Sequence, residues 1–133
     1  MRTTAKHFEI FKKECERWQK AFGLLNWEFN FYHSKEDERS IATTECDNDN
    51  RVAFITLNTG LEDVEITNYE IKKSAFHEVM EVLLYSIRYI AEERYVNECE
   101  IDTEIHNIIR TLEHVVFEEM QNGKSRVGKK VNI

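Results

Sequence analysis

Residues 74–88 read Ser-Ala-Phe-His-Glu-Val-Met-Glu-Val-Leu-Leu-Tyr-Ser-Ile-Arg, and they predict a helix with one polar stripe and one apolar face. At about 100° per residue, His77 and Glu81 lie one turn apart, so their side chains converge on the same face. Leu84 and Arg88 continue that line. Apolar residues recur at helical spacing on the opposite side, and we expect them to pack into the core: Phe76, Met80, Leu83, Ile87 and Ile90.

An imidazole and a carboxylate four residues apart on a helix can bind one divalent metal ion. Zinc-protease helices use side chains at i and i+4 in this way, and the residue after the first His polarises a water molecule. The corresponding residues here are His77, Glu81 and Glu78. The usual second ligand is His, whereas this chain has Glu81. The chain is 32% charged, so the same pair also fits an ordinary solvated helix face, and both interpretations stay open.

Composition indicates one globular domain. The chain has 133 residues, of which 41% are hydrophobic and 11% aromatic, enough for one core but not for two. We expect a single domain over residues 1–121 and a basic, flexible tail over residues 122–133. The net charge of −7 argues against a broad nucleic-acid-binding surface. Nucleic acid is therefore not an expected partner.

The cysteines and the hydropathy pattern predict a cytoplasmic protein. Cys15, Cys46 and Cys99 are far apart and form no C-x-x-C pair, so neither a disulfide framework nor a cysteine zinc site is indicated. No apolar run approaches the length of a membrane span, and the N-terminus lacks the hydrophobic region of a signal peptide. We therefore expect no membrane partner.

The order of periodic segments predicts an α+β fold: an N-terminal helix, a short three-stranded antiparallel sheet and two long helices. The strands should form a meander, because the turn between the second and the third is short. The N-terminal helix should lie across one face of the sheet. The expected helices are residues 4–22, 67–94 and 102–121, and the expected strands are residues 25–33, 41–46 and 51–58.

The last helix is the most promising source of a third metal ligand. His106 lies on one flank of its expected apolar stripe and is the first candidate, and Glu104 on the other flank is the second. For His106, a hydrogen-bonded surface histidine is an equally good interpretation. The apolar stripe, which we expect to face the core, consists of Ile101, Ile105, Ile108, Leu112 and Val115.

Four stretches together resemble a known group of proteins. They are Trp27-Glu28-Phe29, the 42–58 hairpin that ends in Ile-Thr-Leu-Asn, Ala75-Phe76-His77-Glu78, and residues 104–113, Glu-Ile-His-Asn-Ile-Ile-Arg-Thr-Leu-Glu. This combination resembles small phage-encoded metallopeptidase-like proteins, which are minimal zincin-like domains related in outline to the SprT-like group. The likeness extends from about residue 18 to residue 117, with H-E-x-x-E in place of H-E-x-x-H.

The resemblance implies a peptidase mechanism. His77 would be the first ligand of a zinc ion, Glu81 would occupy the position of the second His ligand, and His106 or Glu104 would be the third. The bound metal would lower the pKa of a water molecule, and Glu78 would take its proton as general base. The peptide would pair with residues 51–58 as an edge strand. A His-Glu-His set also suits another divalent metal, such as iron or manganese.

A second function belongs to another class. The chain is also consistent with a catalytically inactive phage accessory protein that keeps the zincin-like fold and uses its acidic surface to bind or inhibit a host protein. A third, purely structural interpretation treats His77 and Glu81 as a polar contact on a helix.

Overall fold

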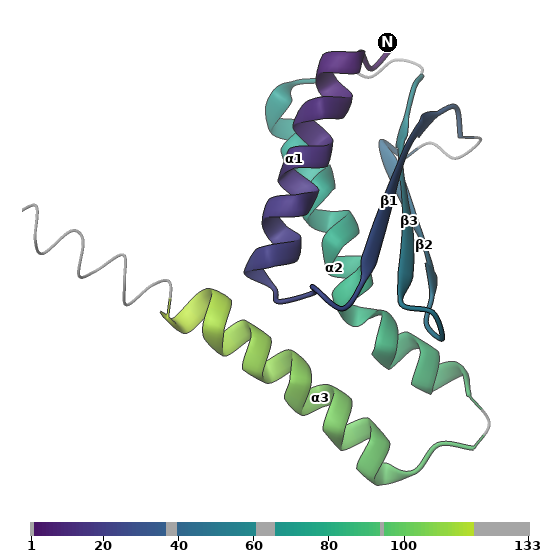
Figure 1. Ribbon diagram of the computed structural model, residues 1–133, viewed down its shortest axis with the longest axis vertical. Helices are drawn as coiled ribbons and strands as arrows, with labels where there is room; N and C mark the ends of the chain where they lie inside the picture. The colour runs from purple at the N-terminus through teal and green to yellow at the C-terminus, as the bar shows by residue number, and fades with distance from the viewer. Residues whose placement is uncertain (1, 37–39, 61–65, 94, 119–133) are drawn as a thin grey trace, which may run out of the picture.

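The computed structural model describes residues 2–36, 40–60, 66–93 and 95–118 (Figure 1). The elements are α1 (Ala5–Ala21), β1 (Glu28–Ser34), β2 (Ala42–Asp47), β3 (Val52–Asn58), α2 (Asn68–Glu92), α3 (Glu98–Leu112) and a π-helical turn, η1 (Glu113–Glu118). The predicted α+β class and the order of the elements are confirmed. The expected tail at residues 122–133 lies outside the described residues.

The sheet is mixed, so the predicted antiparallel meander is wrong. The strand order is β1-β3-β2, in which β3 pairs parallel with β1 and antiparallel with β2. The predicted hairpin of β2 and β3 is present, but β1 lies on the far side of β3. Ala53, Ile55 and Leu57 of β3 are fully buried, and as alternate residues they lie on one face of the strand. Both edges of β3 are paired. Residues 51–58 are therefore not an edge strand.

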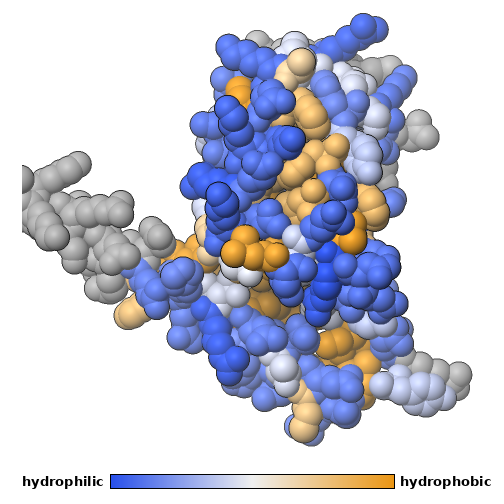
Figure 2. All heavy atoms as spheres, viewed as in Figure 1, coloured by the Kyte–Doolittle hydropathy of each residue, from blue (hydrophilic) through white to orange (hydrophobic). Residues whose placement is uncertain are grey.

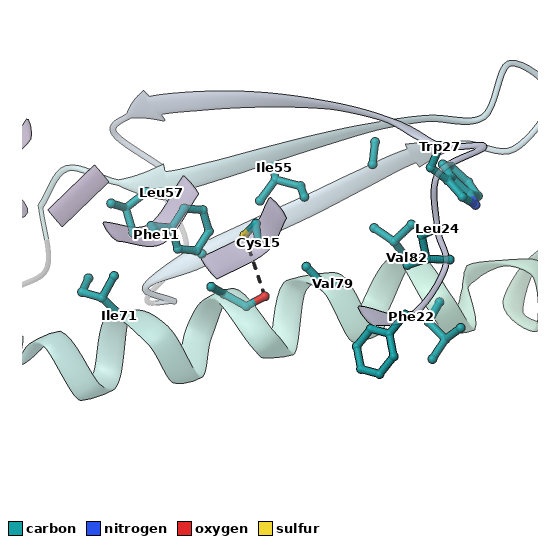
Figure 3. Packing of buried hydrophobic residues seen from close by; sticks show 14 of the residues in the cluster. Phe11, Cys15, Phe22, Leu24, Trp27, Ile55, Leu57, Ile71, Val79 and Val82 are labelled. Carbon is teal, nitrogen blue, oxygen red and sulfur yellow. Dashed lines mark hydrogen bonds between the residues drawn. The ribbon is translucent and has the colours of Figure 1, made fainter. Parts of the chain in front are cut away.

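Helices α1 and α2 cover the same face of the sheet, as expected for α1 (Figure 1). The core fills the space between this helical layer and the strands, where Phe11 and Cys15 of α1 lie near Val79 of α2 and Ile55 of β3 (Figure 3). The thiol of Cys15 donates a hydrogen bond of 3.8 Å to the carbonyl oxygen of Ala75. Hydrophobic residues also form a band at the surface between α1 and the strands (Figure 2).

Local signals account for both ends of α1. The Thr4 side chain accepts a hydrogen bond from the backbone N–H of His7, and the His7 ring accepts one from the backbone N–H of Thr4. This capping box satisfies two N–H groups that a helix start otherwise leaves unpaired. Gly23 follows the helix with a φ of 68°, a conformation that glycine adopts without strain.

The buried face of α2 is rotated from the predicted one. Its buried residues are Ile71, Ala75, Glu78, Val79, Val82 and Leu83. Only Leu83 belongs to the predicted set. Phe76 is partly exposed and lies at the edge of the α1–α2 contact, with its ring 4.8 Å from that of Trp18. The rotation arises because α2 contacts both α1 and β2. The side of α2 that lies between these two elements is therefore the buried one.

Helix α3 lies apart from the two-layer body (Figure 1). It has no buried residue, and of the core stripe predicted for the last helix only Ile108 in α3 and Val115 in η1 pack against the core. The prediction that Ile101, Ile105 and Leu112 face the core is wrong, because these three side chains are exposed. No helix among the described residues is long and apolar enough to cross a membrane.

Asn58 connects the end of β3 to the segment that leads into β2. Its side chain is fully buried. The side-chain oxygen accepts hydrogen bonds of 3.2 Å from the backbone N–H groups of Glu36 and Gly60, and the side-chain nitrogen donates one of 3.2 Å to the carbonyl oxygen of Ser40. Asn58 therefore fixes where β2 begins beside α2.

Replacing this side chain should destabilise the protein. We expect Asn58→Ala to lower the free energy of unfolding by about 2–3 kcal/mol, because buried backbone groups lose their partners. Urea denaturation followed by tryptophan fluorescence measures the change. Asn107→Ala, at an exposed position on α3, is the control and should change the stability by less than about 0.5 kcal/mol. Equal midpoints for the two variants would contradict the role of Asn58.

Candidate functional site

An open groove of about 460 Å³ lies between α2 and β2. Its lining comes from the strand and from the polar side of the helix. The residues are Ser40, Ile41, Ala42, Thr43, Thr44, Glu45, Ser74, His77, Glu78 and Glu81. A second hollow of about 340 Å³ shares Thr44, Glu45 and Glu81 with the first and adds Cys46, Tyr85 and Arg88. The two hollows therefore form one groove along β2.

The groove faces the edge of β2. Six consecutive residues, 40–45, line it, whereas the side chains of a strand alternate between its two faces. A hollow lined by consecutive residues must therefore lie alongside the backbone. Among the described strands, β2 pairs only with β3, so its other edge is open.

The register of the hairpin identifies the backbone groups on that edge. Asn58 donates a 2.8 Å hydrogen bond to the carbonyl oxygen of Ile41, and hydrogen-bonded and non-hydrogen-bonded pairs alternate along an antiparallel ladder. Residues 43, 45 and 47 therefore bond to β3. It follows that Ala42, Thr44 and Cys46 direct their N–H and C=O groups into the groove.

His77 and Glu81 form the outer wall of the groove. Their side chains are 69% and 34% exposed, and His77 Nε2 lies 3.5 Å from Glu81 Oε1. Two ligands that each lie about 2.1 Å from a tetrahedral ion are about 3.4 Å apart. The pair therefore fits two neighbouring positions around one divalent ion. The other oxygen, Glu81 Oε2, lies 3.1 Å from a guanidinium nitrogen of Arg88.

Glu78 lies deeper in the groove than its neighbours and is only 6% exposed. The hydroxyl of Thr44 donates a short hydrogen bond of 2.5 Å to Glu78 Oε2. Burial of a carboxylate is costly unless hydrogen bonds compensate for lost water. Thr44 therefore holds the Glu78 carboxylate against β2, within the same groove as His77.

The two candidates for a third ligand lie elsewhere. His106 is 52% exposed on α3, and its Nδ1 lies 2.9 Å from the carbonyl oxygen and 3.4 Å from the carboxylate of Asp102. Glu104 lines hollows between α2 and α3. The structure thus brings together His77, Glu78 and Glu81 but neither of these two. In the described part of the chain, no group of three or more His, Cys, Asp or Glu side chains is arranged to hold a metal ion. The three-ligand site stays a prediction.

Two thiols near the groove are poor nucleophiles. Burial and the negative charge of Glu81 raise the pKa of Cys46 to about 11, and burial together with Glu78 raises the pKa of Cys15 well above its usual range. Both thiols are therefore protonated at neutral pH, whereas the thiolate is the reactive form. The imidazole and the carboxylates that line the groove are the candidates for acid–base chemistry.

Sequence reasoning missed Thr44 as a site residue. The strand alternation places Ala42, Thr44 and Cys46 on one face, but it does not say which element lies opposite. The contact between Thr44 and Glu78 spans 34 residues of sequence. Arg88 was placed on the line of His77 and Glu81, but its ion pair with Glu81 was not predicted.

The chain matches no protein-family model, no curated protein and no solved structure. The residues of the groove are therefore the basis of the functional proposal.

Removing the Thr44 hydroxyl should show whether it holds Glu78. We expect Thr44→Val to lower the free energy of unfolding by about 1–3 kcal/mol, because a buried carboxylate loses a donor. Thr44→Ser keeps the hydroxyl and should stay close to the wild type. Urea denaturation at pH 7 compares the three proteins. If the Val and Ser variants were equally stable, the hydrogen bond would not be what secures Glu78.

Proposed function

We propose that the protein is a metal-dependent peptidase that acts on an extended peptide bound along β2. The observation that carries this proposal is the open edge of β2 beside His77, Glu78 and Glu81 in one groove. The substrate strand is thus β2 and not residues 51–58, because β3 is central in the sheet.

The peptide would bind by adding a strand to the sheet. Its backbone would form hydrogen bonds with the outward N–H and C=O groups of Ala42, Thr44 and Cys46. This pairing would draw an extended chain past α2 and present its carbonyl groups to His77 and Glu78. The shared groove continues to Arg88, so the peptide would be held on both sides of the reacting bond.

His77 and Glu81 are the residues that would hold a zinc ion or another divalent cation. When bound, such an ion supplies Lewis-acid polarisation of a water molecule or a carbonyl oxygen. Glu78 would accept a proton from the attacking water and later transfer it to the leaving nitrogen. The Thr44 hydroxyl fixes the position of one oxygen of Glu78 for this step.

Peptide cleavage tests this proposal directly. The zinc-loaded protein should cleave members of an unstructured peptide library, and a chelator should stop the cleavage. His77→Ala should lose both bound zinc, measured by mass spectrometry, and turnover. Glu78→Gln should keep zinc and lose turnover by at least about 100-fold. His114→Ala, at an exposed histidine whose Nδ1 lies 2.6 Å from Glu118 Oε2, is the control. An intact library and a metal-free wild-type protein would refute the proposal.

The strand-addition mode makes a separate prediction. Cys46→Pro removes an outward N–H but no hydrogen bond of the β2–β3 ladder, so peptide binding should weaken about tenfold while the fold remains. Cys46→Val keeps the N–H group and should bind as the wild type does. Fluorescence anisotropy of labelled peptides measures the affinity. All proteins in this comparison also carry Glu78→Gln, which prevents cleavage during the measurement. Equal affinities of the Pro and Val variants would rule out backbone pairing at this edge.

A second candidate function is peptide or host-protein binding without turnover. Two observations favour it. Among the described residues, only two candidate ligands, His77 and Glu81, lie together, and Glu81 forms an ion pair with Arg88. In that case the Cys46→Pro effect on binding would remain, but no cleavage would occur with any divalent metal. The phage origin and the cytoplasmic location stay predictions under both functions.

A further inference from the structure

An exposed apolar stripe runs along α3, the helix that lies apart from the two-layer body (Figure 1). Its residues follow one another at spacings of three and four, and helix geometry places those in α3 within about 80° of one another. Their exposed fractions range from 38% to 50%. The stripe consists of Ile101, Ile105, Ile109 and Leu112 in α3 and Val116 in η1.

The stripe is not the side of α3 that meets the rest of the protein. Ile108 packs against the core, and Glu104, Asn107 and Thr111 line a hollow between α3 and the body. At about 100° per residue, these four residues lie roughly 60° to 160° away from Ile105, all in the same direction around the helix. The stripe is therefore free to contact another molecule while α3 stays docked on its own body.

The length and the surroundings of the stripe favour a protein partner. Residues 101 to 116 span about 22 Å of helix, and a contiguous apolar surface of this kind marks an interaction site, unlike scattered exposed residues. Helices that bind anionic membranes are rich in Lys and Arg, whereas α3 and η1 carry six carboxylates and one arginine. These charged residues are Glu98, Glu100, Asp102, Glu104, Glu113, Glu118 and Arg110.

The spacing of the stripe suits a second copy of the same helix. Ile105, Ile109, Leu112 and Val116 recur at four, three and four residues, which is the repeat of a coiled-coil seam. Such a seam packs against an identical one, and a two-fold contact pairs the same surface on both subunits. In an antiparallel pair, Ile109 would lie beside Leu112 of the second copy, and Ile105 beside its Val116.

The charges beside the stripe favour the antiparallel direction. Glu98 and Asp102 lie at the N-terminal end of α3, on the side of the stripe. A parallel pair would place each of these carboxylates next to its own copy, and like charges repel. His106 and Glu113 lie together on the flank of the stripe that faces away from Ile108. An antiparallel pair would bring His106 of one copy to Glu113 of the other, twice by symmetry.

We propose that the protein forms an antiparallel homodimer through the stripe on α3 and η1. The groove along β2 is lined by α2 and the strand segment and by no residue of α3. A dimer of this form therefore has two open grooves, one on each subunit. The proposal goes beyond the peptidase function and does not depend on a metal ion or on cleavage.

Sedimentation analysis of the full chain tests the dimer. Between about 1 and 100 μM, the mass of the wild type should rise toward twice the 15.9 kDa of one chain. Ile109→Glu should raise the dissociation constant at least about 100-fold, because it would bury a carboxylate in the seam. The milder Ile109→Gln should raise it about tenfold. Asn107→Glu adds the same charge on another side of α3, at an exposed position, and should dimerise as the wild type does.

Circular dichroism verifies that each variant keeps its helices. A wild type that stays monomeric would overturn the proposal and would leave the stripe to a different protein. Dimers that survive Ile109→Glu, or that dissociate equally with Asn107→Glu, would overturn the placement of the interface on the stripe.

A charge exchange tests the antiparallel direction. His106→Glu would place this side chain next to Glu113 of the other copy and should weaken the dimer about threefold to tenfold. Adding Glu113→Lys to the same chain restores opposite charges across the interface and should recover the affinity of the wild type. Equal dissociation constants for the single and the double variant would overturn the antiparallel arrangement.

Discussion

The packing of α2 against both α1 and the sheet is the constraint on which the rest of the structure depends. Burial of Ile71, Ala75, Val79 and Val82 fixes the rotation of the helix, because apolar area removed from water stabilises the fold by about 25 cal/mol per Å². This rotation also buries Glu78 and leaves His77 on the rim. The apolar residues of α2 thus determine how deeply Glu78 and His77 lie in the groove.

Local patterns in the sequence were sufficient to predict the elements but not their neighbours. The helical spacing of the apolar residues in α2 is a pattern of nearby residues, and it predicted that helix. The pairing of β1 with β3 is not local. It depends on the burial of the apolar residues of β3 as a whole, and no single turn signal reveals that. The rotation of α2 escaped prediction for a similar reason, since both Phe76 and Val79 suit a core and the positions of α1 and β2 decide between them.

The same distinction between local and long-range determinants applies to the candidate site. The spacing of His77 and Glu81 within one helix predicted their proximity correctly, because helix geometry alone determines it. The contact of Glu78 with Thr44 requires knowledge of which strand lies beside α2. The placement of His106 depends on the connection between α2 and α3, and the chain turns there so that α3 contacts mainly the C-terminal half of α2. A helical wheel contains none of that information.

The proposed pairing of a peptide with the open edge of β2 would have a consequence for selectivity. Recognition through main-chain groups is largely indifferent to side-chain identity, and it demands a polypeptide whose own amides are unpaired. A natively folded protein offers few such segments, while a nascent, damaged or intrinsically unstructured chain offers many. A protein built in this way would sort its targets by their degree of folding and not by a sequence code.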